Sequence, residues 1–171
     1  MEDLKKYIRD VPDFPKKGII FKDITTLLKR GEIFKEVIDT FAERYKSSNL
    51  DSIVSVEARG FIMGSALAYK LGTGIIPVRK KGKLPYKTER ITYNLEYGTD
   101  TLEIHKDAIN SGDRVLIIDD LLATGGTISA AAQLVEKQDG KIVEIAFLIE
   151  LAFLNGRDKL KKYDVFSLIQ Y

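Results

Sequence analysis

Short runs of β-branched and aliphatic residues alternate with segments of helical period, and this alternation restricts the fold more than any other feature of the chain. The runs lie at positions 53–56, 75–78, 115–118, 142–149 and 165–169. Apolar residues recur at helical spacing over positions 33–45, 60–71 and 127–137. Strands that alternate with helices form βαβ units around a mainly parallel sheet. We therefore predict an α/β protein, Rossmann-like, with helices flanking the sheet.

Two segments interrupt the alternation. Residues 79–113 contain RKKGKLPYKTER, the alternating ITYNLEYG and a second strand-like run, TLEIHK, which together predict an inserted lid hairpin. Residues 11–28 contain two prolines and a glycine, which predicts a small, partly irregular N-terminal cap over about residues 1–30. A chain of 171 residues is the size of one domain, so we expect a single domain over residues 1–171.

The composition excludes several classes of protein. The chain contains no cysteine, so it has neither disulfides nor thiolate metal ligands. His105 is the only histidine, which disfavours a His–Asp catalytic pair and a multi-histidine metal site, and its charged surroundings predict an exposed side chain. No apolar run approaches the roughly 20 residues of a membrane span. We therefore expect a cytoplasmic protein with no membrane partner.

The most informative segment is VLIIDDLLATGGT at positions 115–127, in which a strand leads through two carboxylates to a glycine turn that opens a helix. Gly125 and Gly126 let backbone N–H groups converge without a Cβ in the way, and the following helix offers the positive end of its dipole. Thr124 and Thr127 add hydroxyl donors, and the lysine of a nucleoside-triphosphate loop is missing. The turn is therefore predicted to hold a monophosphate.

Asp119 and Asp120 stand at the end of the strand, directly before this turn. Adjacent carboxylates in that place are suited to accept hydrogen bonds from a vicinal diol, so the segment describes a site for a ribose 5-phosphate. Alternatively, the aspartates only end a strand or cap a helix, and the glycines form an ordinary connection. The order of strand, carboxylate pair, turn and helix favours the functional interpretation.

The same segment resembles the diphosphoribosyl-binding motif of the type I phosphoribosyltransferases, and LLATGGT is the form found in their adenine-specific members. Further blocks resemble that family in the same order: PDFPKKGIIFKDITTLL at 12–28, EARGF at 57–61, RKKGKLP at 79–85, LEYG at 95–98 and the final FSLIQY. The resemblance implies the type I phosphoribosyltransferase fold. It also implies a purine-salvage enzyme that transfers the 5-phosphoribosyl group from phosphoribosyl pyrophosphate to adenine, giving AMP and pyrophosphate.

The basic run at 79–90 has no stacking aromatic beyond Tyr86, so we expect no nucleic-acid partner. The resemblance further implies a homodimer, and Mg²⁺ that arrives with pyrophosphate and is held mainly by the substrate rather than by protein ligands. It assigns the ribose 5-phosphate to Asp119, Asp120, Ala123, Thr124, Gly125, Gly126 and Thr127. It assigns pyrophosphate to Arg59, Arg79 and Lys83, and the base to Ile20, Phe21, Lys22 and Leu151. Glu96 is implied to be the general acid/base that handles the purine proton.

The chain departs from the family pattern in two places and leaves other interpretations open. The family more often has arginine at the position of Lys22, which puts a side-chain contact there in doubt, and ITTLL replaces a proline-containing version. The basic run at 79–90 is also compatible with a nucleic-acid patch or a plain solvated loop. A phosphoribosyltransferase for xanthine or another purine, and a regulator that keeps this fold, are the alternative functions. The presence of Arg59 and Glu96 favours an enzyme.

Overall fold

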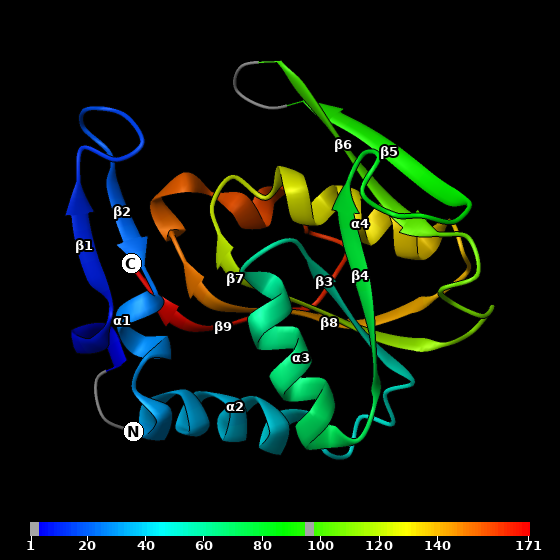
Figure 1. The fold of residues 1–171 in the computed structure, drawn as a ribbon, viewed down its shortest axis with the longest axis horizontal. Helices are drawn as coiled ribbons and strands as arrows, with labels where there is room; N and C mark the ends of the chain where they lie inside the picture. The colour runs from blue at the N-terminus through cyan, green and yellow to red at the C-terminus, as the bar shows by residue number, and fades with distance from the viewer. Residues whose placement is uncertain (1–3, 95–97) are drawn as a thin grey trace.

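A seven-stranded, mainly parallel sheet forms the centre of the computed structural model, which describes residues 4–94 and 98–171 (Figure 1). The strand order is β5-β6-β4-β3-β7-β8-β9. The parallel strands are β3 (Ser52–Val56), β4 (Gly74–Lys80), β7 (Arg114–Leu122), β8 (Lys141–Glu150) and β9 (Val165–Gln170). The sheet and its flanking helices confirm the predicted α/β class, and each of these strands contains one of the predicted runs.

Helices cover both faces of the sheet and bury its alternating side chains. The helices are α1 (Thr25–Leu28), α2 (Gly31–Tyr45), α3 (Gly60–Leu71) and α4 (Gly126–Glu136). Ile53 and Leu116 belong to the apolar cluster under α2 and α3, whereas their neighbours Val54 and Ile117 belong to the cluster under α4. Successive strand residues point to opposite faces, so unbroken apolar strands fill two cores at once.

The chain reverses its direction of progress across the sheet at β3 and β7. From β3 the chain passes through α3 to β4 on one side, while β7 pairs with the other side of β3. Helices that follow the two strands leave in different directions at such a switch point, which opens a crevice at the carboxyl ends of the strands. Residues 57–59 and 119–120 lie at those ends, so the topology brings these distant segments together.

The segment at 79–113 folds as an antiparallel hairpin that extends the sheet. It consists of β5 (Thr88–Asn94) and β6 (Thr99–His105), and β6 joins the end of β4 through the pairs Arg79↔Glu103 and Lys80↔Leu102. Its inner face packs against α4. The prediction of an exposed His105 is wrong: the side chain is half-buried and packs edge-on against Tyr86, at 6.2 Å between ring centres.

The N-terminal segment forms a small sheet of its own beside the C-terminus (Figure 1). After a 3-10 turn, η1 (Leu4–Tyr7), β1 (Arg9–Pro12) pairs antiparallel with β2 (Ile20–Asp23). The ammonium of Lys22 lies 4.0 Å from the ring centre of Tyr171, which ties β2 to the end of the chain. In the described residues, no helix is long and apolar enough to cross a membrane.

Candidate active site

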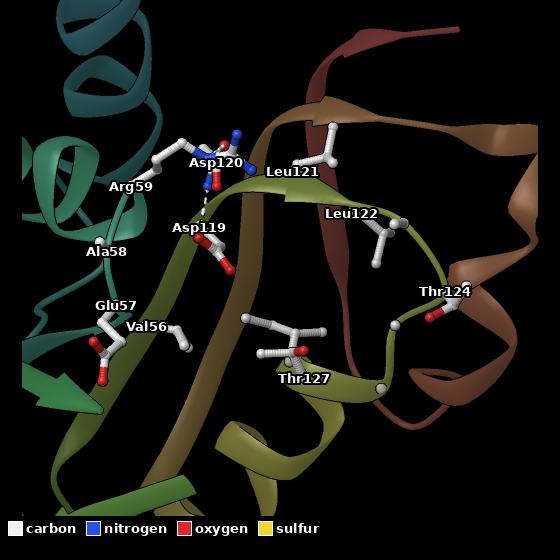
Figure 2. Close-up of a pocket in the computed structure, with 14 residues that line it drawn as sticks. Val56, Glu57, Ala58, Arg59, Asp119, Asp120, Leu121, Leu122, Thr124 and Thr127 are labelled. Atoms are coloured by element: carbon white, nitrogen blue, oxygen red, sulfur yellow. Dashed lines mark hydrogen bonds and ion pairs between the residues drawn. The ribbon is translucent and has the colours of Figure 1, made fainter. Parts of the chain in front are cut away.

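A cleft of about 420 Å³ opens at the switch point between β3 and β7 (Figure 2). Among the described residues, its lining comes from two segments, residues 56–59 and 119–128. The second segment contains every residue predicted to bind ribose 5-phosphate, and the first contains Arg59. The structure therefore brings together the predicted ribose, phosphate and Arg59 positions in one cavity.

The two aspartates at the end of β7 are adjacent, with Asp120 buried and Asp119 half-buried in the wall of the cleft. Asp120 is 5% exposed, and its backbone N–H donates to Asp119 Oδ1 at 2.9 Å. Burial raises the pKa of Asp119 well above its ordinary value, and the charge of Asp120 adds to the shift. Burial also raises the pKa of Asp120, although Arg59 opposes the shift. Hydrogen bonds from hydroxyl donors would stabilise the ionised form of these carboxylates, and a diol would supply such donors.

Space for the Asp119 carboxylate depends on Gly60, the first residue of α3. A Cβ built at position 60 would lie 2.6 Å from Asp119 Oδ1. The glycine that opens this helix therefore has a packing role, because any side chain there would push the carboxylate out of place.

The glycine turn that follows β7 adopts the backbone that its sequence predicts. Gly125 has φ +76°, in the left-handed region, and is the N-cap residue of α4. Within residues 4–94 and 98–171, no side chain makes a capping hydrogen bond at the N-terminus of α4. The first N–H groups of a helix need partners from outside it, so the start of α4 favours an anion. In Figure 2 the side chain of Thr127 points into the cleft, facing Asp119.

A second wall supports this turn from outside the cleft, and sequence reasoning missed it. Gly156, at the start of η3 (Gly156–Lys159), lies so close that a Cβ at Gly125 would stand 3.2 Å from its carbonyl carbon and closer still to its oxygen. Conversely, a Cβ at Gly156 would stand 2.9 Å from Leu122 Cδ1 and closer still to the Ala123 carbonyl oxygen. Two glycines thus allow two backbone segments to touch.

Arg157 fixes this second wall to the sheet. Its Nε and Nη2 each donate to Glu150 at 2.7 Å, and its Nη1 donates to the carbonyl of Val165 at 2.9 Å. The side chain of Glu150 is only 5% exposed. A bidentate Arg–carboxylate pair of this kind has a defined geometry. The pair therefore fixes the position of Gly156 and, through it, of the turn.

Arg59 is engaged on two sides in this structure. Its Nε forms an ion pair with Asp120 Oδ2 at 2.8 Å. The two groups are not aligned for a hydrogen bond, and Asp120 Oδ2 has no hydrogen-bond partner among the described residues. Its guanidinium also lies 5.0 Å from the ring centre of Phe21. Arg59 thus joins the carboxylate pair to the segment predicted to bind the base.

Glu57 gathers the other two cations predicted for pyrophosphate. Lys83 Nζ donates to Glu57 Oε2 at 2.7 Å, Arg79 Nη2 lies 3.4 Å from the same oxygen, and Lys80 N donates to Oε1 at 2.6 Å. Burial raises the pKa of Glu57, but these contacts outweigh it and leave the pKa below its ordinary value. Arg79 and Lys83 are therefore held beside the cleft by a lining residue, although neither lines it.

The residues predicted for the base lie near the cleft and do not line it. Phe21 packs edge-on against Phe14 at 5.2 Å and touches the cleft through Arg59. Ile20 and Phe21 belong to β2, which pairs only with β1 in the described sheets, so one backbone edge of β2 is left for other partners. The N–H of Leu151 donates to Leu122, two residues beyond Asp120.

The side chain of Lys22 makes its contacts within the cap. Its Nζ donates to Asp10 Oδ1 at 2.7 Å and lies over the Tyr171 ring. Its side chain is only 12% exposed. The side chain is thus committed to holding β1, β2 and the C-terminus together, which leaves only its backbone for a ligand.

Two further side chains border the glycine turn and were not predicted from the sequence. The hydroxyl of Tyr93, on β5, lies 3.1 Å from Thr127 Oγ1. The ammonium of Lys159 lies 3.7 Å from the place that a Cβ of Gly126 would occupy. The predicted catalytic residue Glu96 lies outside the described residues, as does the rest of 95–97.

The fold and the cleft together define a phosphoribosyltransferase, and the comparison with known families agrees. Residues 23–170 match the phosphoribosyl transferase domain. A relative from Syntrophotalea carbinolica, named adenine phosphoribosyltransferase, is 63% identical, and the alignment covers the whole of both chains. The chain belongs to the adenine phosphoribosyltransferase family.

Solved structures of that family have the same fold. The adenine phosphoribosyltransferase of Thermoanaerobacter pseudethanolicus superposes with a TM-score of 0.96 at 56% identity, over 99% of each chain. The Saccharomyces cerevisiae enzyme, solved with adenine and an imino-altritol bisphosphate, superposes with a TM-score of 0.92 at 43% identity, over 96% of each chain.

Proposed function

We propose that this chain transfers the 5-phosphoribosyl group of phosphoribosyl pyrophosphate to adenine, forming AMP and pyrophosphate in purine salvage. The observation that carries the proposal is the cleft at the switch point, where the carboxylate pair Asp119 and Asp120 and the glycine turn face one cavity. The full-length identity to adenine phosphoribosyltransferases supports adenine as the base.

The ribosyl group is proposed to lie between Asp119, Asp120 and residues 123–127, which are called the phosphate turn. Its 2- and 3-hydroxyls donate to the two carboxylates, and its phosphate accepts from the N–H groups at the start of α4 and from Thr124 and Thr127. Donors and carboxylates placed on both sides of C1′ fix its orientation toward the base. The raised pKa of Asp119 supports this role, because the hydroxyl donors would stabilise the charge that burial disfavours.

Arg59, Arg79 and Lys83 are proposed to stabilise the leaving pyrophosphate. During the reaction the bond from C1′ to the pyrophosphate oxygen breaks, the bond from C1′ to N9 of adenine forms, and the N9 proton leaves. Negative charge grows on pyrophosphate as its bond breaks, so cations near it lower the barrier. Glu96, which follows the end of β5 closely in the sequence, is proposed to receive the purine proton.

Mg²⁺ is proposed to enter with pyrophosphate and to be held mainly by substrate oxygens and water. Among residues 4–94 and 98–171 no three His, Cys, Asp or Glu side chains form a cluster that could hold a metal. The buried Oδ2 of Asp120 lacks a hydrogen-bond partner in the same residues, which fits a donor such as a metal-bound water. Mg²⁺ commonly keeps several waters and few protein ligands. When bound, it would neutralise charge on the leaving group.

Adenine is proposed to be read by the backbone of Ile20 and Lys22 and to stack between Phe21 and Leu151. The unpaired edge of β2 supports the first part, and the place of Phe21 beside Arg59 supports the second. A backbone reader depends on strand geometry rather than on side chains. The ties of Lys22 to Asp10 and Tyr171 would therefore serve base recognition by fixing β2.

A cytoplasmic homodimer is the proposed state of the protein. Tyr69 is 91% exposed, and Ile62, one heptad earlier on the same face of α3, is 41% exposed. Ile75, on β4, is also an exposed apolar side chain. Light scattering should give the mass of two chains, and Tyr69→Glu should give the mass of one.

The proposed function is tested by pyrophosphate release from purified protein with Mg²⁺ and phosphoribosyl pyrophosphate. Adenine, hypoxanthine, guanine and xanthine are offered in turn, and turnover is expected with adenine alone or far above the others. Faster turnover with xanthine than with adenine would show that xanthine is the preferred substrate. Binding of phosphoribosyl pyrophosphate without turnover of any base would favour a regulator over an enzyme.

A further inference from the structure

Tyr93 connects the β5–β6 hairpin to the phosphate turn through a single hydrogen bond. Its side chain points to the inner face of the hairpin and is half-buried, while its neighbour Thr92 is exposed. The Tyr93 hydroxyl lies 3.1 Å from Thr127 Oγ1. The Tyr93 ring also packs close to Gly126, with Cδ2 3.6 Å from the place of a Cβ there. Tyr93 therefore packs on the outside of the turn and does not line the cleft.

The direction of this hydrogen bond decides what Thr127 can offer a ligand. A threonine hydroxyl has one hydrogen to donate, and an anionic phosphate oxygen only accepts. If Tyr93 accepted from Thr127, that hydrogen would be used inside the protein. If Tyr93 donates, the Thr127 oxygen is satisfied and its hydrogen is free to point into the cleft.

The surroundings of Tyr93 keep its hydroxyl protonated, and so able to donate. Burial raises the pKa of the Tyr93 hydroxyl, and the charge of Asp100 adds to the shift, while Thr127 and Lys80 act in the opposite direction. The phenol thus stays protonated at neutral pH. Hydrogen bonds to charged groups are also stronger than neutral ones, so a phosphate would favour the arrangement in which Thr127 donates to it.

We propose that Tyr93 is a positioning residue for the ribosyl substrate: it donates to Thr127 and so aims the Thr127 hydroxyl at the 5′-phosphate. This inference rests on the proposed function, because it needs a phosphate at the turn. It assigns to the hairpin a role in substrate binding that is separate from any role of Glu96 in the chemistry.

The test is a double-mutant cycle that combines Tyr93→Phe with Thr127→Val, both of which keep the shape of the side chain. AMP affinity is measured by calorimetry, and the KM for phosphoribosyl pyrophosphate and kcat by steady-state assay. Tyr93→Phe alone should weaken AMP binding and raise that KM by about 3- to 10-fold, the worth of one net hydrogen bond, with kcat changed less than about twofold. In the Thr127→Val background, Tyr93→Phe should change AMP affinity by less than about twofold.

Two further variants separate positioning from general effects on the hairpin. Thr127→Ser keeps a hydroxyl, so in that background Tyr93→Phe should again weaken AMP binding about 3- to 10-fold. Thr92 lies on the opposite face of β5 from Tyr93, and its hydroxyl contacts that of Thr101 on β6 at 2.9 Å. Thr92→Val removes this contact and should leave AMP affinity unchanged. The effect of Thr92→Val also measures what loss of a hydroxyl contact does to the hairpin as a whole.

The outcomes distinguish this inference from the proposed function. Wild-type protein that binds no AMP would remove the proposed function itself. If the wild type binds AMP, then equal losses from Tyr93→Phe with and without the Thr127 hydroxyl would overturn the positioning role. Unchanged AMP affinity in Tyr93→Phe alone would overturn it as well.

Discussion

Gly125→Ala is expected to damage the phosphate turn, while Gly126→Ala, one residue later, is expected to leave the fold intact. At Gly125 the left-handed φ of +76° costs an alanine about 1–2 kcal/mol. Its Cβ would also stand 3.2 Å from the carbonyl carbon of Gly156, and relief of such crowding costs about 1–3 kcal/mol. At Gly126 the nearest atom lies 3.6 Å away, an ordinary contact.

The expected loss of unfolding free energy for Gly125→Ala is therefore about 2–5 kcal/mol, against about 0.5 kcal/mol or less for Gly126→Ala. The displaced turn should also lose at least two of its hydrogen bonds to phosphate, which weakens AMP binding at least about 100-fold. Urea unfolding measures the first quantity and calorimetric AMP titration the second. A Gly125→Ala protein as stable as Gly126→Ala, with wild-type AMP affinity, would refute the reasoning about the Gly156 contact.

Three other predictions test the charges around the cleft. Asp119→Asn should lower kcat/KM for phosphoribosyl pyrophosphate by about 10- to 100-fold, since a charge-assisted bond is lost. Asp119→Asn should also raise the melting temperature at neutral pH. The pKa of Asp119 is raised in the folded state, so the folded protein loses stability as pH rises and the carboxyl ionises. Asparagine does not ionise and so avoids this loss. Lys159→Gln should weaken AMP binding about 2- to 5-fold, and more at low salt, whereas Lys161→Gln, whose cation pairs with an exposed carboxylate on the same segment, should not. Glu57→Gln should change the KM for phosphoribosyl pyrophosphate by about 2- to 10-fold, measured by initial rates, because it releases Lys83 from its carboxylate partner; an unchanged KM would mean that this ion pair does not compete with substrate.

The sheet and its helices could be predicted from the sequence because each element has a local sequence pattern. The strand runs are unbroken and apolar, which is the pattern of strands that are buried on both faces. The range 60–71 expected for a helix is the range of α3 in the structure, since Gly60 opens it and the αL residue Gly72 closes it. The segment 115–127 was equally explicit, because strand, carboxylates and turn are contiguous in the chain.

The second wall of the phosphate turn could not be predicted, because its contacts join residues far apart in the chain. Nothing local marks Gly156 as different from a loop glycine, and its reason for being a glycine is the backbone of residues 122–125. The same holds for Glu57, whose partners are 22 to 26 residues away. His105 was misjudged for a related reason: its charged neighbours in sequence say nothing about Tyr86, which covers it in space.

The charged side chains around the cleft are paired with one another within the protein. Arg59 is paired with Asp120, while Lys83 and Arg79 are paired with Glu57. A pyrophosphate that recruits Arg59 would remove the cation beside Asp120, and burial of that unpaired carboxylate is costly unless a new donor replaces it. The ribose hydroxyls of the same substrate are such donors. Binding of the two ends of phosphoribosyl pyrophosphate is therefore expected to be cooperative within one molecule, since the ribose end supplies the donors that Asp120 needs when the pyrophosphate end recruits Arg59.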